Sequence, residues 1–291
     1  MYHVILAGGS GSRFWPKSRE DSPKQLTKIL GDETMIRLTY NRLRKIAETD
    51  EILVVASKQI SKLIHKDIPE IPKENFILEP SGKNTAPAIG LAALHIFKRD
   101  SDAVMGVYPA DHLIVGDSKF KKIITNARKM VEKKSALITI GIKPTYPATG
   151  YGYIQYDSNK KMVIQGVYKV KTFAEKPEKE TAEKFINSGK FLWNAGMFVW
   201  KAEIILLQMK TFMCKLHDSL DAIYDSLNTT QYDTVLDREW ELIQPESIDY
   251  GVLEKAKNVY TIEADFQWND LGSWSSLFNV LTKNNETNYH D

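Results

Sequence analysis

The sequence has a single cysteine, no long hydrophobic run and no excess of charge of either sign. Of its 291 residues, 43% are hydrophobic and 26% are charged, which is typical of a soluble globular protein. Cys214 cannot form an intrachain disulfide, and its apolar neighbours predict that it occupies a small position in the core. A chain of this length buries roughly 75% of the surface that its unfolded form exposes, so no disulfide is needed for stability.

The charge balance excludes several classes of partner. With 39 Lys and Arg against 37 Asp and Glu, the net charge of +2 gives no broad field for a nucleic acid or an anionic membrane. The sequence contains no stretch of about eighteen apolar residues, and the apolar run that ends at Ala7 is too short for a signal peptide. We therefore expect a cytoplasmic protein with no nucleic-acid or membrane partner, which holds any anionic ligand locally.

The first half of the chain alternates between two patterns. Short apolar, β-branched runs predict strands, and apolar residues spaced three and four apart between them predict helices. This alternation is typical of an α/β fold with a Rossmann-like mixed, mainly parallel sheet and helices on both faces. Ligands of such sheets bind beyond the carboxyl ends of the strands. The runs are residues 4–7, 52–56, 76–78, 103–108 and 137–140, and the helical segments are residues 34–47, 85–98 and 118–134.

The second half has a different pattern. Residues 153–156 and 169–174 alternate polar and apolar positions, and residues 202–227 predict one long helix or a pair. We expect an α+β extension on the first sheet within one domain over residues 1–283, with a first half at about 1–148 and a second half at about 149–272. A final helix is expected to begin near Ser273, and residues 284–291 form a polar tail.

A glycine-rich turn follows the first apolar run, with two cations after it. Gly8, Gly9 and Gly11 allow a tight turn whose N–H groups approach a phosphate, and Arg13 and Lys24 supply charge suited to a triphosphate. Taken alone the signal is weak, because an ordinary left-handed turn also explains such glycines. A dinucleotide-binding motif requires a third glycine where Phe14 stands, which argues against an NAD-dependent dehydrogenase.

Two aspartates follow predicted strands. Asp111 comes after the run 103–108, and Asp270 comes after the segment 259–262. Two carboxylates without a Cys or His cluster suit Mg²⁺, which prefers hard oxygen ligands and keeps water and phosphate oxygens. The alternative is that each aspartate only caps a helix. His112 fits a structural hydrogen-bonding role better than that of a general base.

Together these motifs, in this order and spacing, identify a resemblance to the mannose-1-phosphate guanylyltransferases, a family of sugar nucleotidyltransferases with a glycosyltransferase-A-like fold. The resemblance extends from Leu6 to about Trp274. It rests on residues 6–16 (LAGGSGSRFWP), 23–25 (PKQ), 79–88 (EPSGKNTAPA), 109–112 (PADH), 149–154 (TGYGYI), 173–177 (FAEKP), 193–198 (WNAGMF), 247–252 (SIDYGV) and 268–274 (WNDLGSW).

The resemblance implies transfer of GMP from GTP to mannose 1-phosphate with release of pyrophosphate. The catalytic residues would be Arg13, Lys24 and Lys176, and Mg²⁺ would be held by Asp111 and Asp270. The nucleotide would contact Leu6, Ala7, Gly8, Gly9, Gly11, Ser12, Glu79, Ser81, Gly82, Asn84 and Thr85, and the sugar phosphate would contact Gly150, Tyr151, Glu175, Asn194 and Asp249. The substrates are the expected partners, and a homodimer is compatible with the resemblance.

This chain departs from the family pattern at two positions. Many relatives have Arg where Lys83 stands and Glu where Ala148 stands, so a bidentate contact at residue 83 and one contact near the sugar are in question. Relatives also carry a C-terminal β-helix-like segment that is not present in full, which is consistent with a fragment. Two alternatives stay open: thymidylyl or uridylyl transfer to glucose 1-phosphate, and a non-catalytic sugar-nucleotide sensor.

Overall fold

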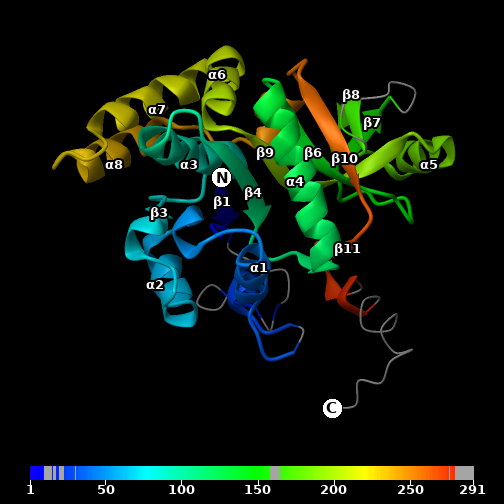
Figure 1. Ribbon diagram of the computed structural model, residues 1–291, viewed down its shortest axis with the longest axis horizontal. Coiled ribbons are helices and arrows are strands. Elements are labelled where there is room, and N and C mark those ends of the chain that lie inside the picture. Colours follow the sequence, from blue (N-terminus) through cyan, green and yellow to red (C-terminus); the bar gives the residue numbers. More distant parts are fainter. Residues whose placement is uncertain are drawn as a thin grey trace.

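The computed structural model describes residues 1–9, 15, 18–19, 23–29, 31–157, 164, 166–274 and 276–278. Within these residues the chain builds a nine-stranded sheet with helices on both faces, together with a two-stranded sheet (Figure 1). The large sheet contains β1 (Tyr2–Leu6), β2 (Ile52–Ala56), β3 (Phe76–Leu78), β4 (Val104–Pro109), β6 (Leu137–Ile142), β7 (Tyr153–Tyr156), β8 (Val167–Ala174), β9 (Phe191–Lys201) and β10 (Val259–Ala264). The small sheet pairs β5 (Leu113–Val115) with β11 (Gln267–Asn269).

The strand order of the large sheet is β3-β2-β1-β4-β9-β6-β10-β8-β7. The neighbours β3, β2, β1 and β4 are parallel, and so are β6 and β10. β9 runs antiparallel to both β4 and β6, so these two strands share one direction on either side of it. The predicted mixed, mainly parallel sheet is confirmed, and the strands predicted at residues 52–56, 76–78 and 153–156 have the expected bounds.

The helices cover the two faces of the sheet over two hydrophobic cores. Adjacent residues Val4 and Ile5 of β1 point into different cores, as expected for a strand buried on both faces. One core includes residues of α1 (Met35–Leu43), α2 (Lys58–Asp67), α4 (Asp117–Lys133) and α5 (Lys179–Ser188). The other includes residues of α3 (Thr85–Arg99), α6 (Ala202–Phe212), α7 (Cys214–Ser226) and α8 (Tyr232–Leu242).

β9 joins the two halves of the chain. Its first part pairs with β7, and its last residues pair with β4, while β6 pairs along both parts. The register shifts between Thr139 and Gly141 of β6, opposite Gly196 of β9, whose φ of +64° is a left-handed conformation that favours glycine. The bulge lets one strand serve both halves, so the sheet is continuous.

The structure corrects the prediction for Cys214. The predicted helical segment 202–227 is a pair, α6 and α7, which are separated at Met213. Because the second helix begins at Cys214, this residue lies exposed at a helix terminus, where its Sγ contacts the carbonyl oxygen of Lys210 at 3.2 Å. The prediction of a core position was wrong, since it used the apolar neighbours without the helix break.

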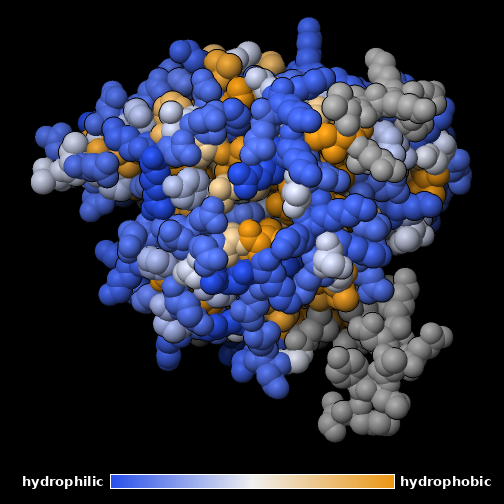
Figure 2. All heavy atoms as spheres, viewed as in Figure 1, coloured by the Kyte–Doolittle hydropathy of each residue, from blue (hydrophilic) through white to orange (hydrophobic). Residues whose placement is uncertain are grey.

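One face of the molecule is drawn by residue hydropathy in Figure 2. On the face drawn in Figure 2, hydrophilic residues dominate and hydrophobic residues form small separate patches. Among the described residues, none of the helices combines the length and the apolar character that crossing a bilayer requires.

Candidate active site

The predicted site residues of the first half lie where parallel strands end. Gly8 and Gly9 follow β1, Glu79 follows β3, and Asp111 follows β4. The Ala7 amide donates to the carbonyl oxygen of Val55 in β2 at 2.9 Å, and the Glu79 amide donates to that of Ala56 at 3.1 Å. These bonds extend the sheet by one step beyond its strands, so the glycine turn and Glu79 lie at the same sheet edge.

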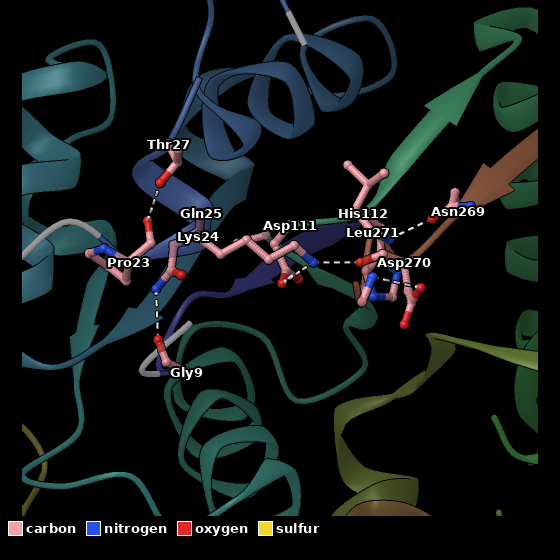
Figure 3. A network of polar contacts seen from close by, with 12 residues as sticks. Gly9, Pro23, Lys24, Gln25, Thr27, Asp111, His112, Asn269, Asp270 and Leu271 are labelled. Carbon is pink, nitrogen blue, oxygen red and sulfur yellow. Dashed lines mark hydrogen bonds and ion pairs between the residues drawn. The ribbon is translucent and has the colours of Figure 1, made fainter. Parts of the chain in front are cut away.

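Two contacts shape the described part of the glycine turn. The Gln25 side chain donates from Nε2 to the carbonyl oxygens of Ala7 at 2.8 Å and Gly9 at 3.0 Å (Figure 3). A Cβ on Gly8 would lie 1.8 Å from Oε1 of Glu79, so a larger residue there would force the buried carboxylate to move. Gln25 was missed by the sequence analysis, although it belongs to the PKQ motif. The predicted site residues Gly11, Ser12 and Arg13 lie outside the described residues.

The segment 79–85 is tied to the second half of the chain. Trp240 of α8 donates from Nε1 to the carbonyl oxygen of Ser81 at 2.8 Å, and the Ile248 amide donates to Oγ1 of Thr85 at 2.9 Å. Asn84, with φ +70°, accepts the Thr85 amide on its side chain at the start of α3. Glu79 is only 3% exposed, and burial raises its pKa to about 7. Trp240 was not predicted, because no local pattern links it to Ser81.

Lys24 brings the two predicted metal-binding aspartates together (Figure 3). Its Nζ lies 2.8 Å from Oδ2 of Asp111 and donates to the main-chain oxygen of Asp270 at 2.5 Å. The Lys24 side chain is buried at the start of η2 (Lys24–Leu26). Burial raises the pKa of Asp111, but the charges of His112 and Lys24 outweigh burial and leave it below its usual value. Three residues far apart in sequence therefore form one charged cluster.

The small sheet positions this cluster. β5 begins two residues after Asp111, β11 ends one residue before Asp270, and Leu113 pairs with Asn269. Nε1 of Trp268 donates to Nδ1 of His112 at 3.3 Å, which confirms the expected structural role of His112. Burial lowers the pKa of this imidazole. The pairing explains why Asp111 and Asp270 lie at adjacent ends of two strands.

The donor set of this cluster suits a hard divalent cation. Oδ1 of Asp270 accepts from the Tyr151 hydroxyl at 2.7 Å and from the Gly272 amide at 3.0 Å, whereas Oδ2 has no hydrogen bond to the described chain. Among the described residues, there is no group of three or more His, Cys, Asp or Glu side chains that could hold a metal. A cation here would therefore complete its coordination with water oxygens, or with phosphate oxygens when a substrate is bound, as Mg²⁺ commonly does.

The predicted sugar-phosphate residues form a second polar cluster. Nδ2 of Asn194 donates to Oδ1 of Asp249 at 2.8 Å, and Oδ1 of Asn194 accepts from the Thr139 hydroxyl at 2.8 Å. Nζ of Lys176 lies 2.8 Å from Oε1 of Glu175. Burial and the nearby charge of Glu175 raise the pKa of Asp249 to about 7. Thr139, missed in the sequence, fixes the orientation of the Asn194 amide.

Local backbone features hold this second cluster in place. Lys176 has a φ of +45°, and its amide donates to the carbonyl oxygen of Tyr151 at 3.2 Å. A Cβ on Gly152 would lie 2.4 Å from Oε2 of Glu175, so the chain passes close to that carboxylate. Asp249 begins a five-residue π-helix, η5 (Asp249–Leu253), and such irregular turns are frequent at functional sites. Gly150 has open space around it and no comparable restraint.

Comparisons with known proteins place the chain in a family. The nucleotidyl transferase family profile matches residues 2–287. The chain is 37% identical over 290 residues to the xanthan biosynthesis protein XanB of Xanthomonas campestris pv. campestris, and 36% identical over 296 residues to a mannose-1-phosphate guanylyltransferase of Escherichia coli K12. Each alignment covers 99% of this chain and 61% of the relative, so the chain spans about three fifths of the length of these relatives.

A solved structure extends the agreement to the fold. The crystal structure named as a mannose-1-phosphate geranyltransferase from Thermus thermophilus superposes with a TM-score of 0.86 at 27% identity, covering 97% of this chain and 79% of that one. Enzymes of the matched family generally use a divalent metal. The family match spans nearly all of the sequence, and the chain belongs to the nucleotidyl transferase family.

Proposed function

We propose that this protein transfers GMP from GTP to α-D-mannose 1-phosphate, giving GDP-mannose and pyrophosphate. The observation that carries the proposal is the placement of Lys24 between Asp111 and Asp270, beside the Gly8–Gly9 turn at the sheet edge. Relatives support the proposal, because several proteins that are each about 36% identical to this chain are named mannose-1-phosphate guanylyltransferases. The substrates are GTP and mannose 1-phosphate, and a second phosphorylated ligand requires a second basic site, which Lys176 supplies.

The nucleotide is assigned to the first cluster. The turn at Gly8, Gly9, Gly11 and Ser12, with Leu6 and Ala7 before it, approaches the phosphates through backbone N–H groups. The segment containing Glu79, Ser81, Gly82, Asn84 and Thr85 contacts the base and ribose. Arg13 binds the β- and γ-phosphates, and Lys24 binds near the α-phosphate. Asp111 and Asp270 would hold Mg²⁺, which would supply positive charge to the phosphates.

The sugar phosphate is assigned to the second cluster. Lys176 binds the phosphate, while Glu175, Asn194 and Asp249 bind sugar hydroxyls, together with the backbone of Gly150 and Tyr151. The attacking phosphate oxygen is already deprotonated, so no residue acts as a general base and no protein nucleophile is needed. Catalysis rests on positioning two anions that otherwise repel each other and on stabilising the charge that develops between them.

We test the proposal by measuring pyrophosphate release with a panel of nucleoside triphosphates and sugar 1-phosphates. The expected result is highest turnover with GTP and mannose 1-phosphate. Highest turnover with dTTP or UTP and glucose 1-phosphate would instead establish the alternative transferase, which the phosphate-binding residues alone do not exclude. Binding without release from any pair would establish a sugar-nucleotide sensor.

The remaining expectations are part of the same proposal. We propose one catalytic domain over residues 1–283 with the two halves at about 1–148 and 149–272, and the continuous sheet through β9 supports treating them as one unit. The proposed location is the cytoplasm, where GTP is available as donor. A homodimer is the proposed assembly, and light scattering coupled to size exclusion measures its mass directly.

A further inference from the structure

Tyr151 contacts both clusters of the site at once. Its hydroxyl donates to Oδ1 of Asp270 at 2.7 Å, in the cluster assigned to nucleotide and metal. Its main-chain carbonyl oxygen accepts the amide of Lys176 at 3.2 Å, in the cluster assigned to the sugar phosphate. The single proton of this hydroxyl is therefore directed at Asp270.

Aromatic neighbours from both halves of the chain hold the Tyr151 ring. The ring packs edge-on against Trp193 of β9, with centroids 5.1 Å apart, and against Trp268 of β11 at 5.3 Å. Such edge-to-face pairs have a preferred geometry, so the ring has little freedom to rotate. Tyr146 adds a third ring and a weak hydroxyl contact at 3.5 Å. The phenol oxygen is therefore held at a defined position beside Asp270.

The carboxylate of Asp270 is restrained on one side only. Oδ1 accepts both the Tyr151 hydroxyl and the Gly272 amide, and the main-chain oxygen accepts from Lys24. Oδ2 makes no hydrogen bond to the described residues and lies close to Gly272, where an added Cβ would be 2.7 Å from it. These contacts fix the rotation of the carboxylate and leave one oxygen for a ligand.

We propose that Tyr151 is a positioning residue that fixes the Asp270 carboxylate, so that Oδ2 alone is presented to the divalent cation. Its backbone at the same time ties this ligand to the segment that carries Lys176. The inference rests on the proposed function for the identity of the reaction, but its central claim concerns metal binding by this chain. Groups that orient metal ligands typically change metal affinity about 10- to 100-fold when they are lost.

The first test is titration with Mn²⁺ alone, in which the signal of free Mn²⁺ is followed by electron paramagnetic resonance. For Tyr151→Phe, which keeps the ring and removes the hydroxyl, we expect the Mn²⁺ dissociation constant to rise about tenfold. Gly272→Ala, which presses on Oδ2 from the other side, should raise it as well. Tyr156→Phe, on the neighbouring strand β7, is the matched control and should bind Mn²⁺ like the wild type. Circular dichroism verifies folding of each variant.

A kinetic readout separates positioning from a general structural defect. In Tyr151→Phe the metal concentration for half-maximal activity should rise, while the KM for the sugar phosphate at saturating metal should stay the same, because the main-chain bond to Lys176 is retained. Mn²⁺ affinity within twofold of the wild type in Tyr151→Phe would overturn the inference, whatever the result for Gly272→Ala, and so would a wild type that binds no Mn²⁺. A wild type that binds Mn²⁺ but releases no pyrophosphate would instead overturn the proposed function alone.

Discussion

The two clusters of the site treat carboxylates in opposite ways. In the first, a buried lysine lies against Asp111, and the charges of His112 and Lys24 keep the pKa of that aspartate below its usual value despite burial. In the second, Lys176 pairs with Glu175, and burial with the charge of Glu175 raises the pKa of Asp249 to about 7. Asp111 is therefore kept charged in the first cluster, whereas Asp249 in the second is largely neutral below about pH 7.

The difference matches the two kinds of ligand that we propose. A metal ion requires an ionised oxygen ligand, so the first cluster must compensate its carboxylates with cations. A sugar hydroxyl both donates and accepts hydrogen bonds, and a protonated carboxyl can donate to it as well. The positive charges of His112 and Lys24 beside Asp111, and burial with the like charge of Glu175 beside Asp249, produce the two behaviours.

The largest expected effect is on turnover, and it follows from disrupting the second cluster. Replacing Lys176 with alanine should lower turnover by about 10²–10³, because the attacking phosphate loses its cation. Steady-state pyrophosphate release measures the change. Lys184→Ala is the control, since Lys184 is also exposed and pairs with a glutamate, Glu180. Turnover in Lys176→Ala equal to that of the control would remove Lys176 from the mechanism.

The next largest effect is on the magnesium requirement, and it follows from disrupting the first cluster. Asp111→Asn and Asp270→Asn each keep the shape of the side chain and lose its charge, so the Mg²⁺ concentration for half-maximal activity should rise at least about tenfold. Activity measured across a magnesium titration gives this value. If both variants respond to limiting magnesium as the wild type does, these aspartates serve only to cap or orient the chain.

A smaller effect concerns the turn beside the first cluster. Gly8→Ala should lower the free energy of unfolding by about 1–3 kcal/mol, because its Cβ would meet Glu79 at 1.8 Å and the buried glutamate has little room to move. Gly9→Ala is the matched control, since nothing lies within 4 Å of its added Cβ. Urea denaturation of both variants compares them, and equal stabilities would show that the turn relaxes freely.

The last effect is a change of stability per pH unit, and it sharpens the electrostatic contrast. The pKa of Asp249 is about 7 in the folded protein against 3.8 as its ordinary value, so between these pH values the folded state keeps a proton that the unfolded state releases. The stabilisation that this proton gives to the folded state is full below about pH 4. It is lost as pH rises to 7, and the free energy of unfolding falls by up to about 1.4 kcal/mol per pH unit. Asp249→Asn should flatten this slope in urea denaturation from pH 5 to 8, whereas exposed Asp218→Asn should retain it.

Much of the fold follows from local sequence pattern. Continuous apolar runs predict strands, which is why β2, buried on both faces, and the short edge strand β3 were predicted with correct bounds. The rule that ligands gather at the carboxyl ends of such strands placed Asp111 at the site edge. Asp270 was predicted from its position after the segment 259–262, but its place beside Asp111 had no local signal, because β11 is short and pairs with the distant β5.

The contacts that sequence reasoning missed are long-range. Gln25 holds the glycine turn through main-chain oxygens, and Trp240 holds Ser81 across the molecule. Neither contact follows from spacing or periodicity, since each depends on how separate elements pack. The exposure of Cys214 has a similar origin. Its neighbours are apolar, but the helix break at Met213 places Cys214 at an exposed helix terminus.

The path of β9 has a practical consequence for dissecting this molecule. The strand enters the sheet between β4 and β6 although it belongs to a much later part of the sequence. Expressing residues 1–148 alone would remove that strand and leave the edges of β4 and β6 with unpaired N–H and C=O groups. Such a truncated product would tend to self-associate through these edges, so the nucleotide half is best studied by point substitution within the intact polypeptide.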